Sequence, residues 1–418
     1  MPDRSGSTGG LPFPAGFYWG CATSPAQIEG ATASEYAGFR ARDGATPDDG
    51  PDHWTRWEDD LQALGDLGLN AYRIGLDWGR LQPAPGAALA AEPLAQYREM
   101  LARLRARRVE PFVTLFHFAC PAWMAEAGGW LHRDAPAWFA DFARRTADAC
   151  DGVRYWITHN EPVVYALMAY IIGEFLPCRR HRPDLALRAL RHLRRGHAQA
   201  YAAIRARRAE ARVGFTKHFK GFQPFRRWHP VDVTTSWLAR LLFDRWGTAG
   251  FLHHRGRQVC DFVGVNYYGR MRMKGLSGVS PLTGWSPETL ARMGAVCDDM
   301  WEQDPRWLAD CLAELAERTE LPLYITENGV ATLNEDLRTH YLREHLRGCA
   351  DAIGRGVALH GFFYWSLLDN FEWSEGLSKR FGLLGVDFGH PDKPRTLRPA
   401  AHLLADAARR NALPPAGD

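Results

Sequence analysis

The 418-residue sequence has little net charge, because 51 Lys and Arg residues nearly balance 48 Asp and Glu residues. A near-neutral chain lacks the strong positive field that holds proteins to nucleic acid. No apolar run approaches the roughly 20 residues that a membrane-spanning helix needs. The first ten residues, MPDRSGSTGG, contain no apolar segment of the kind found in secretory signals. We therefore expect a cytoplasmic protein with neither a nucleic-acid nor a membrane partner.

The sequence also lacks the usual motifs for metals and cofactors. Its eight cysteines are scattered singly and none lies in a CxxC pair, so neither a zinc site nor a disulfide scaffold is expected. There is no HExxH pair, no phosphate-binding glycine loop and no dinucleotide fingerprint. We therefore expect no metal and no cofactor.

The chain contains 46% hydrophobic and 24% charged residues, as ordinary globular proteins do, and 16 Trp. Short apolar, β-branched or aromatic runs recur along it, separated by segments with helical spacing. Helix starts are marked by Asp134, with Pro136 behind it, and by Asp304, with Pro305 behind it. We predict eight strands: Phe17–Thr23, Ala71–Trp78, Pro111–Phe118, Tyr155–His159, Val213–Phe219, Phe262–Tyr268, Leu323–Thr326 and Phe362–Leu367.

Alternating strands and helices with no break in composition predict an α/β fold, a single (β/α)₈ barrel over residues 1–418. We expect the active site at the C-terminal ends of the strands, and flexible tails at about residues 1–10 and 412–418. The segment 179–212 carries eleven Arg against two acidic residues. Its apolar stripe, which includes Leu190 and Ile204, favours a solvated outer helix over a nucleic-acid-binding surface.

Two carboxylates follow the fourth and seventh predicted strands. Glu161 stands beside Asn160 in THNEP, and Glu327 stands beside Asn328 in ITENG. Because these strands lie on opposite sides of a closed eight-stranded barrel, their carboxyl groups can face each other across its mouth. Such a pair is typical of glycosidic bond cleavage, in which one acid protonates the leaving oxygen and the other stabilises or attacks the anomeric centre.

Seven segments between about residues 17 and 388 resemble glycoside hydrolase family 1 and occur in the order expected for it. They are FYWGCATSPAQIEGA, LNAYRIGLDWGRLQP, TLFHFACP, YWITHNEP, DFVGVNYYG, LYITENG and FYWSLLDNFEWSEGLSKRFGLLGVDF. The resemblance implies a retaining β-glycosidase, most simply an exo-acting β-glucosidase that acts on small β-glycosides or short oligosaccharides such as cellobiose.

The resemblance also assigns roles to individual residues. Glu161 matches the general acid/base and Glu327 matches the nucleophile. Asn160 matches the residue that hydrogen-bonds the sugar 2-hydroxyl. Three residues match groups that support the nucleophile, namely Arg73, Asn266 and Tyr268. Five further residues match the cage and stacking floor of the non-reducing sugar, namely Gln27, His117, Glu372, Trp373 and Trp365.

The two carboxyls need different protonation states for this chemistry. We expect burial and the neighbouring negative charge to raise the pKa of Glu161. We expect Arg73 to hold the pKa of Glu327 low. A bell-shaped pH profile of activity follows from this arrangement.

The sequence departs from the family pattern at several positions. Phe118 stands where the family usually has Trp, which removes an indole N–H donor from the sugar cage, and His159 stands where Phe or Leu is usual. The segments 31–50 and 270–296 are short, which leaves the aglycone preference open. Glu372 and Trp373 stand where members acting on 6-phosphoglycosides carry small residues, so neutral glycosides are favoured.

Several activities stay open on the sequence alone. The same site could act as a β-galactosidase or β-fucosidase, since Glu372 can bridge two hydroxyls of any of these sugars. It could also transfer the sugar to an alcohol or a second sugar instead of water. A non-catalytic sugar-binding protein is the least favoured alternative, because both catalytic carboxylates are present.

Overall fold

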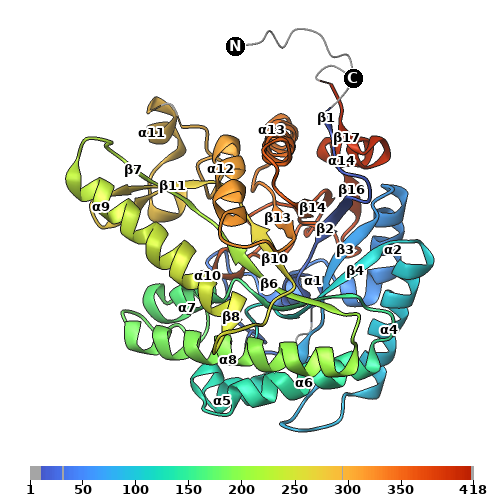
Figure 1. The fold of residues 1–418 in the computed structure, drawn as a ribbon. Coiled ribbons are helices and arrows are strands. Elements are labelled where there is room, and N and C mark those ends of the chain that lie inside the picture. The colour runs from blue at the N-terminus through green and yellow to red at the C-terminus, as the bar shows by residue number, and fades with distance from the viewer. Residues whose placement is uncertain (1–10, 31–32, 294, 416–418) are drawn as a thin grey trace.

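In a computed structural model that describes residues 11–30, 33–293 and 295–415, eight parallel strands close into a barrel (Figure 1). Around the barrel the order is β10, β13, β14, β2, β3, β4, β5 and β6. These strands are β2 (Tyr18–Ala22), β3 (Ala71–Gly75), β4 (Glu110–Phe116), β5 (Tyr155–Asn160), β6 (Arg212–His218), β10 (Phe262–Asn266), β13 (Leu323–Asn328) and β14 (Leu359–Trp365). All eight predicted strands are found, so the predicted (β/α)₈ barrel is confirmed.

Helices surround the barrel as an outer layer (Figure 1). The longer ones are α2 (His53–Asp66), α4 (Ala91–Ala106), α6 (Ala135–Ala149), α8 (Pro183–Arg207), α12 (Pro305–Ala316), α13 (Glu335–Gly354) and α14 (Pro399–Arg410). Two begin as predicted, since Asp134 precedes α6 and the Asp304 carboxylate accepts a hydrogen bond from Trp307 N at 3.3 Å. The arginine-rich segment forms α8, whose Leu190 and Ile204 are buried, so it is the outer helix that its apolar stripe predicts.

Shorter elements form the connections at both ends of the barrel. The short helices are α1 (Pro25–Ile28), α3 (Trp78–Leu81), α5 (Ala122–Glu126), α7 (Pro162–Leu167), α9 (Pro230–Ala239), α10 (Gly247–Leu252), α11 (Pro287–Arg292), η1 (Pro47–Asp49), η2 (Gly129–Leu131), η3 (Met168–Ile172), η4 (Arg240–Trp246), η5 (Pro281–Thr283) and η6 (Trp373–Glu375). The short strands are β7 (Gly221–Pro224), β8 (His253–His254), β9 (Arg257–Gln258), β11 (Arg270–Lys274), β12 (Ser277–Val279), β15 (Leu384–Val386) and β16 (Arg395–Leu397). Strands β12, β11 and β7 form a three-stranded sheet outside the barrel.

Aromatic side chains fill the interior of the barrel. Phe112 and Tyr155 stack with ring centroids 4.2 Å apart, and Phe262, Tyr324 and Phe363 pack around them. A barrel interior of this width is a packed core and not a channel. Polar chemistry is therefore confined to the strand ends.

The C-terminal end of the chain differs from the prediction. We expected a flexible tail from about residue 412, but Ala412 and Leu413 form β17, which pairs with β1 (Leu11–Pro12). The Asn411 side chain reinforces this pairing, because its amide donates to Phe13 O at 2.9 Å and its oxygen accepts from Trp19 Nε1 at 3.0 Å. The rest of the predicted tails, residues 1–10 and 416–418, lies outside the described residues.

Among the residues that the structure describes, no helix has the length and apolar character needed to cross a membrane.

Candidate active site

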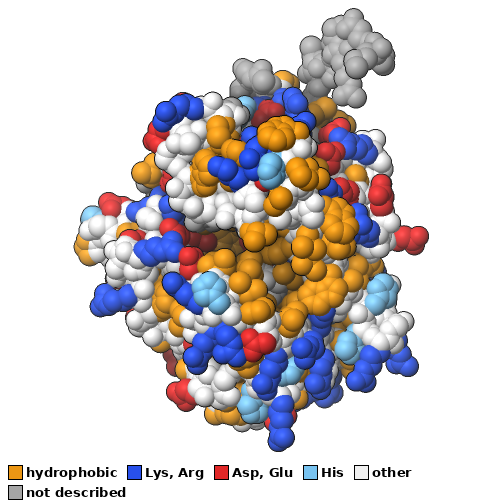
Figure 2. Space-filling model, turned by 90° about the vertical axis from the view of Figure 1, so that its left-hand side faces the viewer, with side chains coloured by type: hydrophobic (Ala, Val, Ile, Leu, Met, Phe, Trp, Pro, Cys, Tyr) orange, Lys and Arg blue, Asp and Glu red, His pale blue; other side chains and the backbone are white. Residues whose placement is uncertain are grey.

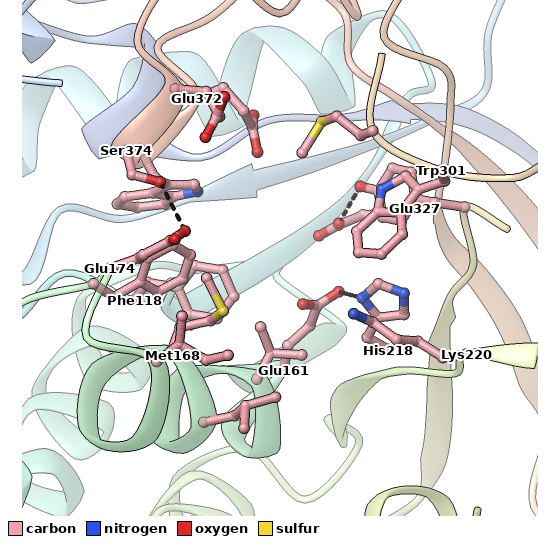
Figure 3. A pocket seen from close by; sticks show the side chains of 18 of the residues that line it. Phe118, Glu161, Met168, Glu174, His218, Lys220, Trp301, Glu327, Glu372 and Ser374 are labelled. Atoms are coloured by element: carbon pink, nitrogen blue, oxygen red, sulfur yellow. Dashed lines mark hydrogen bonds and ion pairs between the residues drawn. The ribbon is translucent and has the colours of Figure 1, made fainter. Parts of the chain in front are cut away.

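A cavity of about 320 Å³ opens at the C-terminal ends of the barrel strands, where the active sites of such barrels lie. Figure 3 shows Glu161 and Glu327 on facing walls of this cavity, with Glu372 on a third side. Nine of the eleven residues predicted from the sequence line it, namely Gln27, His117, Asn160, Glu161, Tyr268, Glu327, Trp365, Glu372 and Trp373. The other two, Arg73 and Asn266, are fully buried and hydrogen-bond residues of its wall.

Glu327 is held by hydrogen bonds to both carboxylate oxygens. It lies near the end of β13, and Tyr268 OH donates to its Oε2 at 2.6 Å. The buried Arg73 guanidinium donates to Oε1 from β3. These two donors fix the orientation of the carboxylate toward the cavity.

Glu161 follows β5 directly and lies in the left-handed region, with φ of 43°. Its backbone N–H donates to Thr216 O at 3.0 Å, and Pro162 begins α7 behind it. The Asn266 amide donates to Glu161 Oε1 at 2.7 Å, and His218 Nδ1 lies 3.6 Å from the same oxygen (Figure 3). The sharp turn after β5 thereby directs this carboxyl into the cavity.

Asn160 connects the groups beneath the two carboxylates. Its Oδ1 accepts hydrogen bonds from Arg73 Nη2 at 2.7 Å and from Thr216 Oγ1 at 2.6 Å. A third donor to Oδ1 is the Asn266 amide, at 3.1 Å. Its Nδ2 lies 3.0 Å from His117 Nε2. Because the oxygen is already engaged, the amide N–H₂ is the group that Asn160 can offer to a bound molecule.

Glu372 forms a second polar cluster on the far side of the cavity. Its Oε2 accepts from Gln27 Nε2 at 3.0 Å and from Asn370 Nδ2 at 3.1 Å. Burial raises the pKa of Glu372 to about 8. The Trp365 ring stacks near His117, with centroids 5.5 Å apart. Polar groups and flat aromatic faces therefore meet in one pocket, as sugar binding requires.

The pKa values of the two facing carboxyls are opposite to our prediction. Burial raises the pKa of Glu161, but His218 and Lys217 outweigh burial and bring it below its ordinary value. For Glu327, burial outweighs Arg73 and, with the nearby negative charge of Glu161, raises the pKa to about 7. The prediction from sequence was wrong because it took no account of Lys217 and His218, the last two residues of β6. Because the two carboxyls interact this closely, they titrate as a coupled pair.

Three of the cavity residues that were not predicted from the sequence lie close to Glu161 or to one another. His218 ends β6, Lys220 follows it, and Trp301 lies over Lys220 with the ammonium 4.2 Å from the ring centroid. A signal for His218 was present, since it occupies the strand-end position at which the other site residues were found. The contribution of Trp301 comes from a loop, and no sequence pattern marks it.

The two residues that depart from the family pattern have different environments. Phe118 lines the cavity and packs between Phe175 and Trp373, with ring centroids 5.1 and 5.4 Å away. His159 points away from the cavity and packs on Phe139 of α6 at 4.5 Å. Phe118 therefore changes the cavity wall, whereas His159 belongs to the packing between barrel and helices.

Two facing buried carboxyls, with side-chain amides and aromatic rings around them, are the groups that the site of a glycoside hydrolase needs. A profile of glycosyl hydrolase family 1 matches residues 11–253 and 249–413. The chain belongs to this family and is a retaining β-glycosidase.

Three comparisons with known sequences and structures show how close the similarity is. The chain is 30% identical to beta-glucosidase A of Thermotoga maritima, over 96% of this chain and 98% of that protein. It is 27% identical to a 6-phospho-beta-galactosidase of Lacticaseibacillus casei, over 96% and 99%. The solved structure of a family 1 β-glucosidase from Thermotoga maritima superposes with a TM-score of 0.85 at 29% identity, covering 97% of this chain and 99% of that one.

Proposed function

We propose that the protein is an exo-acting β-glucosidase that removes the terminal non-reducing β-D-glucosyl residue from small β-glucosides and short oligosaccharides. We assign Glu327 as the nucleophile and Glu161 as the general acid/base. The observation that carries this assignment is the double anchoring of the Glu327 carboxylate by Arg73 and Tyr268, which presents an oriented anion to the cavity. Glu161 faces it from the other wall.

The reaction proceeds by two displacements at the anomeric carbon. In the first, a Glu327 oxygen bonds to this carbon while the glycosidic C–O bond breaks, and Glu161 gives its proton to the leaving oxygen. In the second, Glu161 takes a proton from water, the water oxygen bonds to the anomeric carbon, and the bond to Glu327 breaks. Two inversions give net retention, and the two carboxyls return to one shared proton.

The first displacement needs the proton on Glu161 and the anion on Glu327. Positive charge that develops at the anomeric carbon stabilises the Glu327 anion, and the leaving oxygen draws the proton from Glu161. Only the singly protonated pair can react, so kcat/KM is bell-shaped in pH. Its alkaline limb reports the higher pKa, that of Glu327, which is about 7.

The sugar hydroxyls fit the polar groups around the pair. We assign the Asn160 amide to the 2-hydroxyl, where a hydrogen bond strengthens in the transition state. Glu372 with Gln27 would bind two hydroxyls at the opposite end of the ring, together with His117 and Trp373. Trp365 would form the stacking floor. All of these side chains line the same cavity.

A phosphate on the sugar is disfavoured by the charge distribution. Glu372 lines the cavity at a position where, by the resemblance to the family, members acting on 6-phosphoglycosides carry a small residue. Lys220 is the one lysine or arginine among the described residues that line the cavity. It lies near Glu161 and away from Glu372 (Figure 3). A phosphate near Glu372 would therefore lack a counter-charge. Galactosides and fucosides, in contrast, are alternative substrates that this charge distribution does not disfavour.

We also propose a cytoplasmic location. All eight cysteines are free in the structure, as reduced thiols are in that compartment.

The decisive experiment uses p-nitrophenyl β-D-glucoside, β-D-galactoside and β-D-fucoside with wild type, Glu327→Gly and Glu161→Ala. We expect the wild type to turn over all three glycosides and to prefer the glucoside. In both variants kcat should fall at least about a hundredfold. Azide should rescue Glu327→Gly to give the α-glycosyl azide, because it attacks once from the emptied face. It should rescue Glu161→Ala to give the β-glycosyl azide, because it attacks the glycosyl-enzyme.

Other outcomes separate the alternatives. The same azide anomer from both variants would refute the assignment of the two roles. Preferred turnover of the galactoside or the fucoside would show that the enzyme is a β-galactosidase or a β-fucosidase. Accumulation of glycosylated acceptors in place of free sugar would establish a transglycosylase. Binding of glucose without turnover of any of the three glycosides would establish a non-catalytic sugar-binding protein.

A further inference from the structure

The helical segment 230–246, formed by α9 and then η4, turns apolar side chains outward. Trp237 is 60% exposed and Leu242 is 52% exposed. Spacings of three and four residues place most of the exposed side chains on one side of the segment. The exposed large apolar residues are Val231, Val233, Trp237, Leu238, Leu242 and Trp246. A surface helix ordinarily has polar residues outside, so this pattern is reversed.

The exposed apolar side chains continue beside the start of α9. Trp228 and Leu276 are 78% and 89% exposed. The turn that carries Leu276 is tied to α9, because Gly275 N donates to Asp232 Oδ1 at 2.8 Å. We call these eight residues (Trp228, Val231, Val233, Trp237, Leu238, Leu242, Trp246 and Leu276) the apolar face. Figure 2 shows a broad hydrophobic area around a hollow on the side of the molecule where α9 and α7 lie.

The charges of this segment are arranged by sign. Both acidic residues turn inward, since Asp232 accepts from Arg226 Nε at 2.8 Å and Asp244 Oδ1 lies 3.6 Å from the buried Lys217 Nζ. The exposed charged residues between positions 227 and 246 are Arg227 and Arg245. The apolar face is therefore accompanied by positive charge and by no exposed carboxylate of its own segment.

The same segment forms part of the cavity wall. Phe243 follows Leu242 directly but points inward, where its ring lies 5.6 Å from that of Phe222, and both rings line the cavity. Ile172, on another part of the cavity wall, is also partly exposed. One helix thus carries the apolar face on its outer side and the cavity wall on its inner side.

We propose that the apolar face adsorbs to a lipid surface with anionic headgroups, and that the adjoining cavity accepts glycosides whose apolar aglycone is held in that surface. Trp, Leu and Val on such a face enter the boundary between headgroups and acyl chains, and Arg beside them pairs with anionic headgroups. A second copy of the chain fits less well, because it would bring the same cations and no exposed carboxylate of this segment.

Adsorption of this kind requires no continuous apolar run, which is why the sequence analysis predicted no membrane partner. The proposed adsorption is independent of the proposed function. The proposal that the cavity accepts membrane-held glycosides rests on the proposed function.

Sedimentation with phosphatidylcholine vesicles, with and without phosphatidylglycerol, tests the adsorption. We expect the wild type to sediment with the anionic vesicles and more weakly with the neutral ones. In Trp237→Asp/Leu242→Asp the partition coefficient should fall about tenfold or more, because two apolar anchors are replaced by charges. Leu397→Asp, at an exposed apolar residue of β16 on another part of the surface, should sediment like wild type.

A second readout connects adsorption to catalysis. With dodecyl β-D-glucoside in the anionic vesicles, the double variant should release glucose about tenfold or more slowly, yet hydrolyse dissolved p-nitrophenyl β-D-glucoside at the wild-type rate. The second rate also shows that the variant is folded, since neither substituted residue lines the cavity.

Three results would overturn the proposal. The first is wild type that stays in the supernatant, and the second is a double variant that sediments as well as wild type. The third is wild type that forms a dimer in solution, which the double substitution dissociates, without binding vesicles. A wild type that sediments but fails to cleave dissolved glucosides would instead refute the proposed function and leave the adsorption standing.

Discussion

Replacing Tyr268 by Phe tests where the shared proton lies. The Tyr268 hydroxyl donates to Glu327 Oε2 at 2.6 Å, and both groups are buried. A hydrogen bond to a charged group contributes about 1.5–3 kcal/mol. Losing it makes the Glu327 anion less stable, so the productive form of the singly protonated pair becomes scarcer. Since about 1.4 kcal/mol corresponds to a factor of ten, kcat/KM at its maximum should fall about 10- to 100-fold.

The direction of the pH shift follows from the pKa order. A donor to the carboxylate lowers the pKa of Glu327, so its loss raises that pKa further above the ordinary value. Because the pKa of Glu327 is the higher one of the pair, its rise moves the alkaline limb of kcat/KM to higher pH. With the opposite order, which we predicted from the sequence, the acid limb would move instead.

The assay is kcat/KM for p-nitrophenyl β-D-glucoside between pH 4 and pH 9, where a free carboxyl and a raised one both titrate. Tyr267→Phe is the matched control, because that buried hydroxyl donates at 2.7 Å to the backbone oxygen of Asp304, away from the carboxyl pair. It should cost about 1 kcal/mol of stability and leave the pH profile unchanged. An unchanged maximum and unchanged limbs in Tyr268→Phe would refute the reasoning.

Two further perturbations test the acid/base residue and the closure of the barrel. His218→Phe removes a group that stabilises the Glu161 anion, so the pKa of Glu161 should rise and the acid limb of kcat/KM should move to higher pH. His197→Phe, behind β5, should leave that limb in place, and an acid limb unmoved in His218→Phe would contradict this role. Asn411→Ala removes the side-chain bonds that join the two ends of the chain and places Ala at a φ of 47°, so urea unfolding should show a loss of about 2–4 kcal/mol. Asn411→Gly, which tolerates that φ, should lose less, and equal losses would show that backbone strain has no part.

Much of the candidate site could be predicted from the sequence. Glu161 and Glu327 were found as polar residues at the ends of apolar runs, and the resemblance added the cage that includes Gln27 and Glu372. The structure brings these segments, separated by hundreds of positions, to one cavity. Residues at the strand ends could be grouped from the sequence because the parallel strands of a closed barrel all end at the same side of the barrel.

The predictions that failed concern features that depend on contacts between distant segments. The pairing of β1 with β17 joins residues about 400 positions apart, so the local composition of the C-terminal tail could not reveal it. The pKa of Glu161 likewise depends on His218 and Lys217, which approach it from the neighbouring strand β6.

The sequence by itself therefore determined the barrel and the family, and it predicted two carboxyls that the fold brings to one cavity, because strand periodicity and motif order are properties of contiguous residues. Only the tertiary structure decided how the pKa of each carboxyl is shifted and which side of α9 and η4 faces solvent. Both are sums over neighbours that the chain brings together in folding: a pKa depends on all nearby charges and on burial, and exposure depends on what else packs against a helix.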